Sequence, residues 1–248
     1  MSERIVYGIN SVLKALQHRA NDVRIVYLDA TAAGRRHEQV IRAADEAGVV
    51  PQQASRDELS QLTGTAKHQG VAARVAGRQV LDDHAALELI AELNNPLILV
   101  LDGVEDPRNF GAILRTADAA GVDLVVTGRS RGVAVTPVVS KVASGAAETQ
   151  VQARVANLAR FLRALRAAGV HTVGADESGT AAVFDVSLTG PLALVMGGEG
   201  KGLRRLTREH CDELVQVPMR GAVESLNVSV AAGVCVYEAL RQRDAASA

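Results

Sequence analysis

Hydrophobic positions in the first 76 residues switch between a helical and an extended spacing. In some segments apolar side chains recur every three or four residues, which predicts amphipathic helices, and in others they form short apolar runs typical of strands. Helices are expected at 9–17, 37–48 and 55–63, and strands at 23–30, 49–55 and 68–76. The pattern therefore predicts a small α/β unit at the start of the chain.

A longer series follows residues 77–83, where the periodicity lapses and a linker is expected. The run 96–104 is continuously apolar with Pro96 at its start, as in the interior of a parallel sheet. Further strands are expected at 123–128, 171–176, 191–198 and 213–219, and helices at 109–121, 136–148, 157–169 and 225–243. Strands alternating with helices predict a mostly parallel sheet covered on both faces.

Composition narrows the class of protein. A chain of 248 residues can bury a substantial core in one or two domains. The first ten residues hold no secretory apolar region, and no apolar run is long enough to span a bilayer. Cys211 and Cys235 are the only cysteines, so neither a disulfide scaffold nor a thiolate metal site is expected. We expect a cytosolic protein that needs no metal and no membrane.

Charge is distributed unevenly although the net charge is only −1. Residues 1–80 hold 11 Lys and Arg against 8 Asp and Glu, whereas residues 81–248 hold 16 against 20. This split permits a phosphate-binding face on the first part, and chance variation over a solvated surface explains it equally well. Aromatic residues are scarce and Trp is absent, which disfavours a base-stacking platform.

The segment PLALVMGGEGKGLRR, 191–205, runs an apolar strand into a glycine-rich loop. It is no phosphate loop, because Gly202 rather than Ser or Thr follows Lys201. It is no dinucleotide fingerprint either, because the glycine after Gly198 and Gly200 comes one residue too early. A backbone that approaches a ligand closely and an ordinary loop both remain open. Glu199, at its centre, is either functional or a first-turn carboxylate beside a helix dipole.

The segment DGVEDPRNFGAILRTA, 102–117, also follows a predicted strand, and ligands of open α/β sheets favour that edge. Arg115 adjoins the apolar stripe of the predicted helix, so its guanidinium should meet a specific anion. A surface ion pair with Asp118 is the alternative. Asn109 is either functional or simply the N-cap of the helix.

The third polar segment is VPMRGAVESLNVSVAAG, 217–233. Ser225 is expected to be the N-cap of the last helix. Asn227 would then lie inside the first helical turn, where Asn is a poor helix former and usually has a partner. The predicted helix therefore leaves Asn227 unexplained.

Taken in order and spacing, NxxxxxR, MGGEGKGL and PMxxxxxSLNVSVAAG resemble the three motifs of the SpoU branch of the SPOUT methyltransferases, over 94–243. HQGV, 68–71, and the α/β unit before it resemble the L30e-like substrate domain of that branch. The resemblance implies an α/β fold in which a C-terminal α/β trefoil-knot (SPOUT) domain follows a small N-terminal L30e-like α/β domain, an exception to unknotted topology. The implied bounds are 1–76 for the L30e-like rRNA-binding domain, 77–93 for a linker and lead-in helix, and 94–248 for the methyltransferase domain.

The resemblance also implies an activity, S-adenosylmethionine-dependent 2′-O-ribose methylation of RNA, in a homodimer formed through the knot domain. TREHCDELVQVPM and VTPVVSKVASGAAE look closest to the members that modify a guanosine in the peptidyl-transferase P loop of 23S rRNA. The implied catalytic residues are Asn109, Arg115, Glu199, Ser225 and Asn227. The implied cofactor-binding residues are Thr127, Gly128, Met196, Gly197, Gly198, Val217, Met219 and Leu226. Core packing explains the apolar positions of the last helix equally well, and Lys201 has no expected task.

Three other functions compete with this one. A tRNA 2′-O-ribose methyltransferase is the nearest, and the separate front domain argues against it. A ribosome-assembly factor that binds RNA without catalysis is the second, and the presence of the motif residues argues against decay of the site. A dinucleotide oxidoreductase is the most distant, because the fingerprint spacing is wrong.

Overall fold

The computed structural model describes residues 3–32, 34–77, 80–130, 132–198, 200 and 202–247. The chain forms two compact units. The first contains Met1–Gln79 and Val135–Thr149, and the second contains Val80–Ala134 and Gln150–Ala248. Residues 135–149 thus pack with the first unit, although the chain places them between two segments of the second. Residues 78 and 79 of the expected linker lie outside the described residues.

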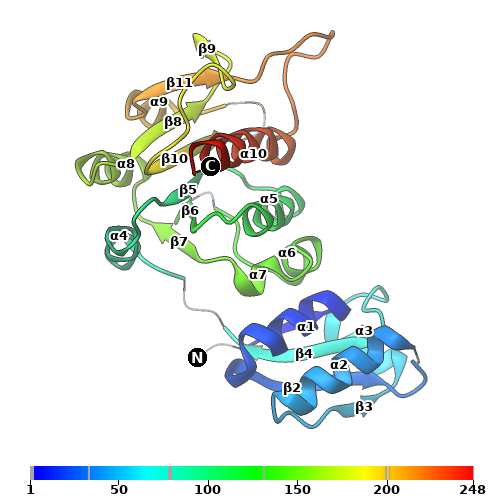
Figure 1. The fold of residues 1–248 in the computed structure, drawn as a ribbon. Coiled ribbons are helices and arrows are strands. Elements are labelled where there is room, and N and C mark those ends of the chain that lie inside the picture. The colour runs from blue at the N-terminus through cyan, green and yellow to red at the C-terminus, as the bar shows by residue number, and fades with distance from the viewer. Residues whose placement is uncertain are drawn as a thin grey trace. The chain divides into compact units, whose positions relative to one another are not determined.

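The first unit is built on a mixed four-stranded sheet in the order β1-β4-β2-β3 (Figure 1). Strands β1 and β2 run antiparallel to β4, and β3 runs parallel to β2. The strands are β1 (Glu3–Tyr7), β2 (Val23–Asp29), β3 (Gln52–Ala54) and β4 (Val71–Ala76). The helices described within residues 1–79 are α1 (Ile9–His18), the 3₁₀ helix η1 (Ala20–Asp22), α2 (Arg35–Glu46) and α3 (Arg56–Thr63). Strand β1 has no counterpart in the predicted pattern, because its short apolar run directly precedes the first helical spacing.

The two faces of this sheet are packed unequally. Alternation along β2 sends Val26 and Leu28 into a core shared with α1 and α2. On the other face Leu59 of α3 packs with Tyr7 and Ala72 in a much smaller cluster. This second face therefore has the thinner apolar cover.

Residues 135–149 contribute two short helices to the first unit, α6 (Pro137–Val142) and α7 (Ala146–Thr149). The single helix expected at 136–148 is wrong, because Ser144 and Gly145 both adopt positive φ angles and interrupt it. In α7 the side chain of Glu148 is fully buried, and its Oε2 accepts hydrogen bonds from Arg4 at 2.5 Å and Arg19 at 2.9 Å. Two arginines from the start of the chain thus hold one carboxylate from its middle.

The second unit is built on a seven-stranded sheet in the order β7-β6-β5-β10-β8-β11-β9, counted over the described residues (Figure 1). Each strand pairing described in this sheet is parallel, as expected. The strands are β5 (Leu97–Asp102), β6 (Leu124–Gly128), β7 (Gln152–Val155), β8 (His171–Ala175), β9 (Ala181–Ala182), β10 (Leu192–Gly197) and β11 (Glu213–Gln216). The helices are α4 (Asp83–Glu92), α5 (Pro107–Ala119), α8 (Leu158–Ala167), α9 (Arg205–Glu209) and α10 (Val228–Ser247).

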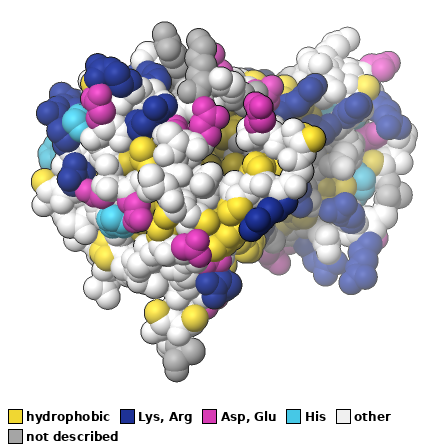
Figure 2. Space-filling view, turned by 90° about the horizontal axis from the view of Figure 1, so that it is seen from above, with side chains coloured by type: hydrophobic (Ala, Val, Ile, Leu, Met, Phe, Trp, Pro, Cys, Tyr) yellow, Lys and Arg dark blue, Asp and Glu magenta, His cyan; other side chains and the backbone are white. Residues whose placement is uncertain are grey.

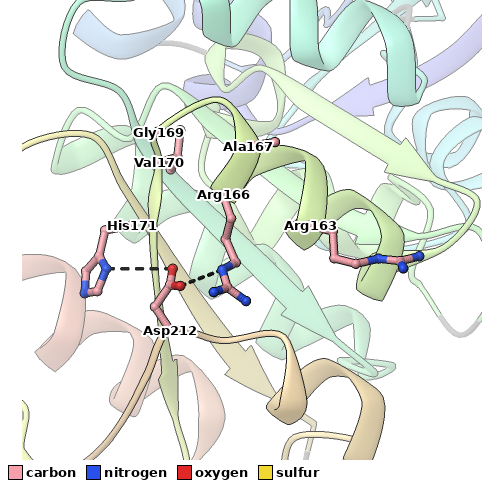
Figure 3. A pocket seen from close by; sticks show the side chains of 7 residues that line it. All are labelled: Arg163, Arg166, Ala167, Gly169, Val170, His171 and Asp212. Carbon is pink, nitrogen blue, oxygen red and sulfur yellow. Dashed lines mark ion pairs between the residues drawn. The ribbon is translucent and has the colours of Figure 1, made fainter.

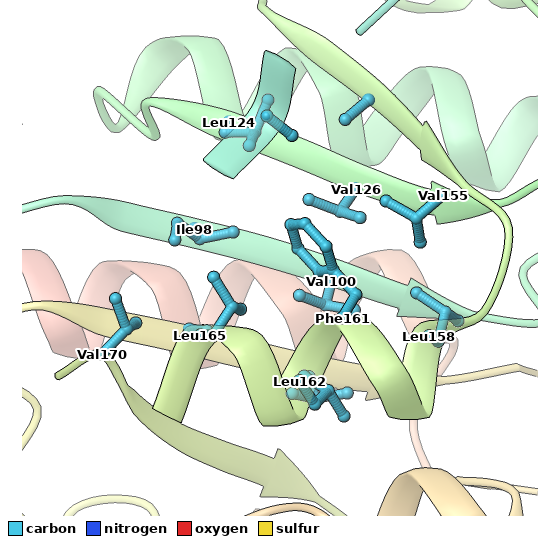
Figure 4. Packing of buried hydrophobic residues seen from close by; sticks show 14 of the residues in the cluster. Ile98, Val100, Leu124, Val126, Val155, Leu158, Phe161, Leu162, Leu165 and Val170 are labelled. Carbon is cyan, nitrogen blue, oxygen red and sulfur yellow. The ribbon is translucent and has the colours of Figure 1, made fainter. Parts of the chain in front are cut away.

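Hydrophobic packing fixes this sheet between its helices. Ile98 and Val100 of β5 belong to the same buried cluster as Phe161 and Leu165 of α8 (Figure 4). Helix α10 packs against α5 and β10. Because every residue of β5 is buried, helices must cover both faces of the sheet, and the polar residues that follow the strands collect at its carboxyl edge.

Helix α5 does not begin where the sequence pattern predicts. It begins at Pro107 and is capped by Asp106, whose side chain accepts hydrogen bonds from the amides of Arg108 and Asn109. The expectation that Asn109 is the N-cap is therefore wrong, because an acidic cap followed by proline is the stronger start signal. Asn109 lies in the first turn instead.

Helix α10 begins at Val228, so the expectation that Ser225 begins and caps it is also wrong. The side-chain oxygen of Asn227 accepts from the Ser229 amide at 2.9 Å and from the Ser229 hydroxyl at 2.6 Å. This is the geometry of an Asn cap, a position that Asn favours strongly. Asn227 therefore does not occupy the unfavourable place inside a helix that the sequence pattern assigned to it.

Candidate functional site

Two of the expected catalytic residues meet although 118 positions separate them in the sequence. Asn227 Nδ2 donates a hydrogen bond to Asn109 Oδ1 over 3.0 Å. Each residue stands at the beginning of a helix, Asn227 as the cap of α10 and Asn109 in the first turn of α5. Packing between α5 and α10 brings these two helix beginnings together.

A cavity of about 280 Å³ opens beside Asn109. It lies where β5 and β10 end, and adjacent parallel strands put these ends at the same edge of the sheet. Its lining consists of Asp102, Gly103, Val104, Glu105, Asp106, Asn109, Gly198, Gly202, Arg204 and Val228. Segments that follow two neighbouring strands therefore form one site with the start of α10.

Two glycines of the loop after β10 are required by the packing of the chain itself. A Cβ on Gly197 would lie 2.2 Å from the carbonyl carbon of Gly202, and one on Gly198 would lie 2.2 Å from the oxygen of Gly103. Both neighbours are backbone atoms, so a small side-chain adjustment could not relieve the overlap. The amide of Gly198 also donates to the Asp102 carbonyl at 2.8 Å. The loops after β5 and β10 are thus in direct backbone contact.

A buried acid at the end of β5 anchors the far end of this glycine loop. The side chain of Asp102 is fully buried and accepts from the Arg204 amide at 3.0 Å. The guanidinium of Arg204 also pairs with the same carboxylate. Sequence reasoning missed both residues, although a charged residue at the end of an apolar strand was a visible signal.

A second acid acts from the strand on the other side of β10. Asp176, which follows β8, accepts from the Leu203 amide at 3.3 Å and lies 3.4 Å from Arg208. Burial by itself would raise the pKa of Asp176, but hydrogen bonds from Ser178 and Leu203 and the charge of Arg208 hold that pKa below its usual value. Asp176 is therefore ionised at neutral pH and holds the loop from the β8 side.

The other expected catalytic residues are less closely connected. Arg115 is exposed on α5, and no hydrogen bond or ion pair joins it to another described residue, so the alternative of an Asp118 ion pair is not seen. At about 100° for each residue, Arg115 and Asn109 point about 120° apart around the helix axis. Within this chain, Arg115 therefore does not lie on the side of α5 on which Asn109 meets Asn227.

The structure describes only one of the remaining two catalytic candidates. Ser225 is exposed in the irregular segment before α10. Glu199 lies outside the described residues, as does Lys201. The structure therefore brings Asn109 and Asn227 together, and the catalytic roles of all five residues stay predictions.

The expected cofactor-binding residues all follow or end parallel strands of the second unit. Thr127 and Gly128 end β6, and Met196 and Gly197 end β10, with Gly198 directly after it. Val217, Met219 and Leu226 belong to the irregular segment between β11 and α10. Val217 and Met219 are half-buried, and Leu226 is 37% exposed. These apolar side chains are only partly covered, and none of the expected set carries a charge.

Another cavity of the second unit, of about 540 Å³, lies beside the beginning of β8 (Figure 3). There Arg166 Nε lies 2.6 Å and His171 Nδ1 3.7 Å from the carboxylate of Asp212, whereas Arg163 points away from this group. Burial would raise the pKa of Asp212, but hydrogen bonds from Thr172 and the charge of Arg166 lower it. Arg166 and Asp212 thus neutralise one another, at the opposite end of the strand from the Asn109 cavity.

Metal ligands and membrane spans are both missing from the part of the chain that the structure describes. No group of three His, Cys, Asp or Glu side chains there is placed to hold a metal ion. No helix among the same residues is both long and apolar enough to cross a membrane.

Comparisons with known proteins agree with this arrangement. A model described as the SpoU rRNA Methylase family matches residues 96–237, and one described as RNA 2'-O ribose methyltransferase substrate binding matches residues 5–81. A protein of Ralstonia nicotianae named 23S rRNA (guanosine-2'-O-)-methyltransferase RlmB is 46% identical over 244 residues, which cover 97% of this chain and 96% of that one.

Solved structures are similar over different extents. The SpoU methyltransferase AviRb from Streptomyces viridochromogenes, in complex with AdoMet, has a TM-score of 0.80 and 28% identity, covering 98% of this chain and 91% of its own. The A. aeolicus TrmH/SpoU tRNA modifying enzyme has a TM-score of 0.57 and 31% identity, covering 66% of this chain and 86% of its own. About a third of this chain thus has no counterpart in the second structure.

Proposed function

Since this chain belongs to the SpoU rRNA methylase family, we propose that it is an S-adenosylmethionine-dependent 2′-O-methyltransferase of a guanosine in 23S rRNA. The observation that carries the proposal is the similarity to the named 23S rRNA enzyme over nearly the whole length of both chains. The hydrogen bond between Asn109 and Asn227 supports it, because it joins two of the three motifs. The proposed target is the guanosine of the peptidyl-transferase P loop, and the proposed place of action is the cytoplasm.

We assign substrate binding to residues 1–76 and methyl transfer to residues 94–248, with 77–93 between them. A tRNA methyltransferase is the less favoured activity, because the similar tRNA modifying enzyme corresponds to only 66% of this chain. The model match at 5–81 supports a dedicated substrate-binding part.

The proposed S-adenosylmethionine site uses the ends of β6 and β10 and the segment after β11. Its chemistry fits the neutral adenosine part of this cofactor, because Val217, Met219 and Leu226 offer incompletely covered apolar surface. The strand ends at 127–128 and 196–198 add polar backbone to the proposed site. When bound, S-adenosylmethionine supplies an activated methyl group.

The chain's own task is to position a ribose hydroxyl and to manage its proton. Alignment of the reacting groups supplies a large part of such catalysis. The guanidinium of Arg115 stays protonated in proteins, so we assign it to stabilising the developing alkoxide and holding the adjacent phosphate. Asn109 and Asn227 are assigned to orienting the ribose, and Ser225 and Glu199 to supporting the same network.

The first unit offers a candidate surface for RNA phosphates at the beginning of α2. Arg36 Nη2 donates to Asn10 Oδ1 at 2.7 Å, and His37 Nε2 lies 3.0 Å from the Gln69 carbonyl. No described side chain caps α2 at Gly34, so polar and cationic side chains surround an uncapped helix N-terminus, a favourable place for a phosphate. Contacts of this kind position RNA without reading its sequence.

We also propose a homodimer formed through the second unit. Helix α10 exposes Val230 and Tyr237, which are 52% and 49% accessible. On the face that Figure 2 shows, exposed hydrophobic side chains lie among charged ones. Exposed apolar surface of this kind is typical of protein interfaces. Sedimentation of the full chain should report a dimer, and a monomer at every concentration would refute this assignment.

The test of the activity begins with a strain that lacks the gene. Mass spectrometry of nucleosides from its 23S rRNA should show loss of one 2′-O-methylguanosine, restored by the wild-type protein. A P-loop guanosine that is still methylated in this strain would rule out the proposed target. Calorimetry with S-adenosylmethionine separates the enzyme from a non-catalytic assembly factor, which would not bind it.

Arg115→Ala tests the assigned role within the same assay. We expect loss of methyl transfer with affinity for S-adenosylmethionine within a few-fold of wild type, because Arg115 is assigned to the RNA rather than to the cofactor. Normal turnover by this variant would remove Arg115 from the mechanism.

A further inference from the structure

A cavity of the first unit lies on the face of the sheet with the thinner apolar cover. Its volume is about 530 Å³, within the range of about 300–1,000 Å³ typical of small-molecule pockets. Its lining consists of Tyr27, Gln52, Gln53, Ala54, Glu58, Leu59, Gln61 and Leu62. Strand β3, at the edge of the sheet, and helix α3 supply most of these residues (Figure 1). None of them belongs to the polar cluster at the beginning of α2.

The floor of this cavity is apolar and its rim carries neutral amides. Leu59 is fully buried, and Leu62 is half-buried. The side chains of Gln52, Gln53 and Gln61 are exposed, and no hydrogen bond joins them to another described residue. Each amide offers both a donor and an acceptor, as the edges of nucleobases do.

Tyr27 contributes an aromatic ring that packs partly against the small apolar cluster on this face. Arg74, on the adjoining strand β4, lies near this ring, and the neighbouring Tyr27 hydroxyl raises the pKa of Arg74. Tyr27 itself is only half-buried. A partly exposed tyrosine ring has few rotatable bonds, so it can stack on a flat heteroaromatic group at little cost in side-chain entropy.

Charge distinguishes a base from a phosphate as the occupant. No described Lys or Arg lines the cavity, and the charged residue in its lining is Glu58. The Glu58 carboxylate accepts from the Ser55 amide and hydroxyl at 2.7 and 2.8 Å, and these hydrogen bonds lower the pKa of Glu58. Arg74, on the adjoining strand β4, lies 3.5 Å from Glu3, so its charge is already partly balanced. An ionised carboxylate in the lining disfavours a phosphate but not an uncharged base.

We propose that this cavity, the Tyr27 pocket, takes one unpaired nucleobase of the RNA substrate, stacked on Tyr27 and hydrogen-bonded by the glutamine amides. The inference rests on the proposed function and adds base recognition to the phosphate contacts assigned to the same unit. RNA-binding proteins usually read sequence from such splayed, single-stranded bases.

Steady-state kinetics with unmodified 23S rRNA provide the test. Tyr27→Leu removes the stacking ring and keeps apolar volume, and Gln61→Glu replaces an exposed amide by a carboxylate. We expect each to raise the KM for rRNA by about tenfold, with kcat and affinity for S-adenosylmethionine unchanged. Gln17→Glu, the same change on the exposed surface of α1, is the matched control and should leave KM unchanged.

Ultraviolet cross-linking of the wild-type protein to the same rRNA separates direct contact from an indirect effect. A nucleotide adduct on Tyr27 or within residues 52–62 is the expected result. Unchanged KM in both pocket variants, or a raised KM without such an adduct, would overturn the inference. Failure of the wild-type protein to methylate rRNA would instead count against the proposed function, so the two failures are distinguishable.

Discussion

Replacing Gly198 by Ala perturbs the contact between the loops after β5 and β10. The new Cβ would lie 2.2 Å from the Gly103 oxygen, whereas ordinary contacts begin at 3.4 Å, so the loops must separate by roughly 1.2 Å. Overpacking of this kind costs about 1–3 kcal/mol. For a protein of this size the Tm should fall by about 2–12 °C. A displacement near 1 Å at a catalytic site also costs about 100-fold in rate.

Calorimetric melting and a methyl-transfer assay measure these two effects. Gly221→Ala is the matched control, because a Cβ there meets nothing within 4 Å and its φ angle is not in the left-handed region. This control should melt like the wild type. If Gly198→Ala matched the wild type in both Tm and turnover, the loop contact would have no role in shaping the site.

The contacts of single side chains lead to three more predictions. Asn227→Ser should keep the α10 cap, since Ser caps about as well as Asn. It should slow methyl transfer about tenfold, because the Ser side chain cannot reach Asn109, and full activity would refute a role of this hydrogen bond. Glu148→Gln should lower the free energy of unfolding of the first unit by about 3 kcal/mol, as its two arginine partners lose a buried carboxylate, and an unchanged urea midpoint would contradict it. Hydrogen bonds from Arg241 and Gln242 lower the pKa of Glu238 from 4.5 to about 2. The ionised Glu238 therefore stabilises the fold fully above pH 4.5, and this contribution is lost as the pH falls toward 2. The free energy of unfolding of the wild-type protein should therefore fall more steeply between pH 4.5 and 2 than that of Glu238→Gln. Equal slopes for the two proteins would count against this role of Glu238.

The fold class could be predicted because local pattern and tertiary context agree. The apolar strands at 96–104 and 191–198 were recognisable as members of a parallel sheet, and the expected SPOUT α/β domain with a small domain before it is confirmed by the similar SpoU structures. Helix beginnings were less predictable. Asp106 and Asn227 are both good caps, but neighbouring Asn109 and Ser225 are capping residue types as well. Pro107 after Asp106 was the stronger start signal for α5, whereas no comparable local signal separates Asn227 from Ser225.

The sequence motifs indicated which segments meet at the candidate site, but not which residues hold those segments in place. The meeting of Asn109 and Asn227 followed from the expectation that polar residues gather at strand ends. The supporting residues were missed because no spacing rule links residues that follow different strands. Asp176 accepts from a backbone amide, and Asp102 binds both the amide and the guanidinium of Arg204. The roles of all five catalytic candidates, Asn109 and Asn227 included, and of the cofactor-binding residues stay predictions.

Because residues 135–149 pack with the first unit, cutting the chain between 76 and 94 does not separate the two units cleanly. A protease cut within residues 77–82 would sever one covalent connection, yet the fragment 1–79 would still bind α6 and α7 through Glu148 and would copurify with the remainder. Expressed alone, that fragment would lack the carboxylate that neutralises Arg4 and Arg19. A fragment meant to keep these ion pairs should therefore include residues 135–149 as well.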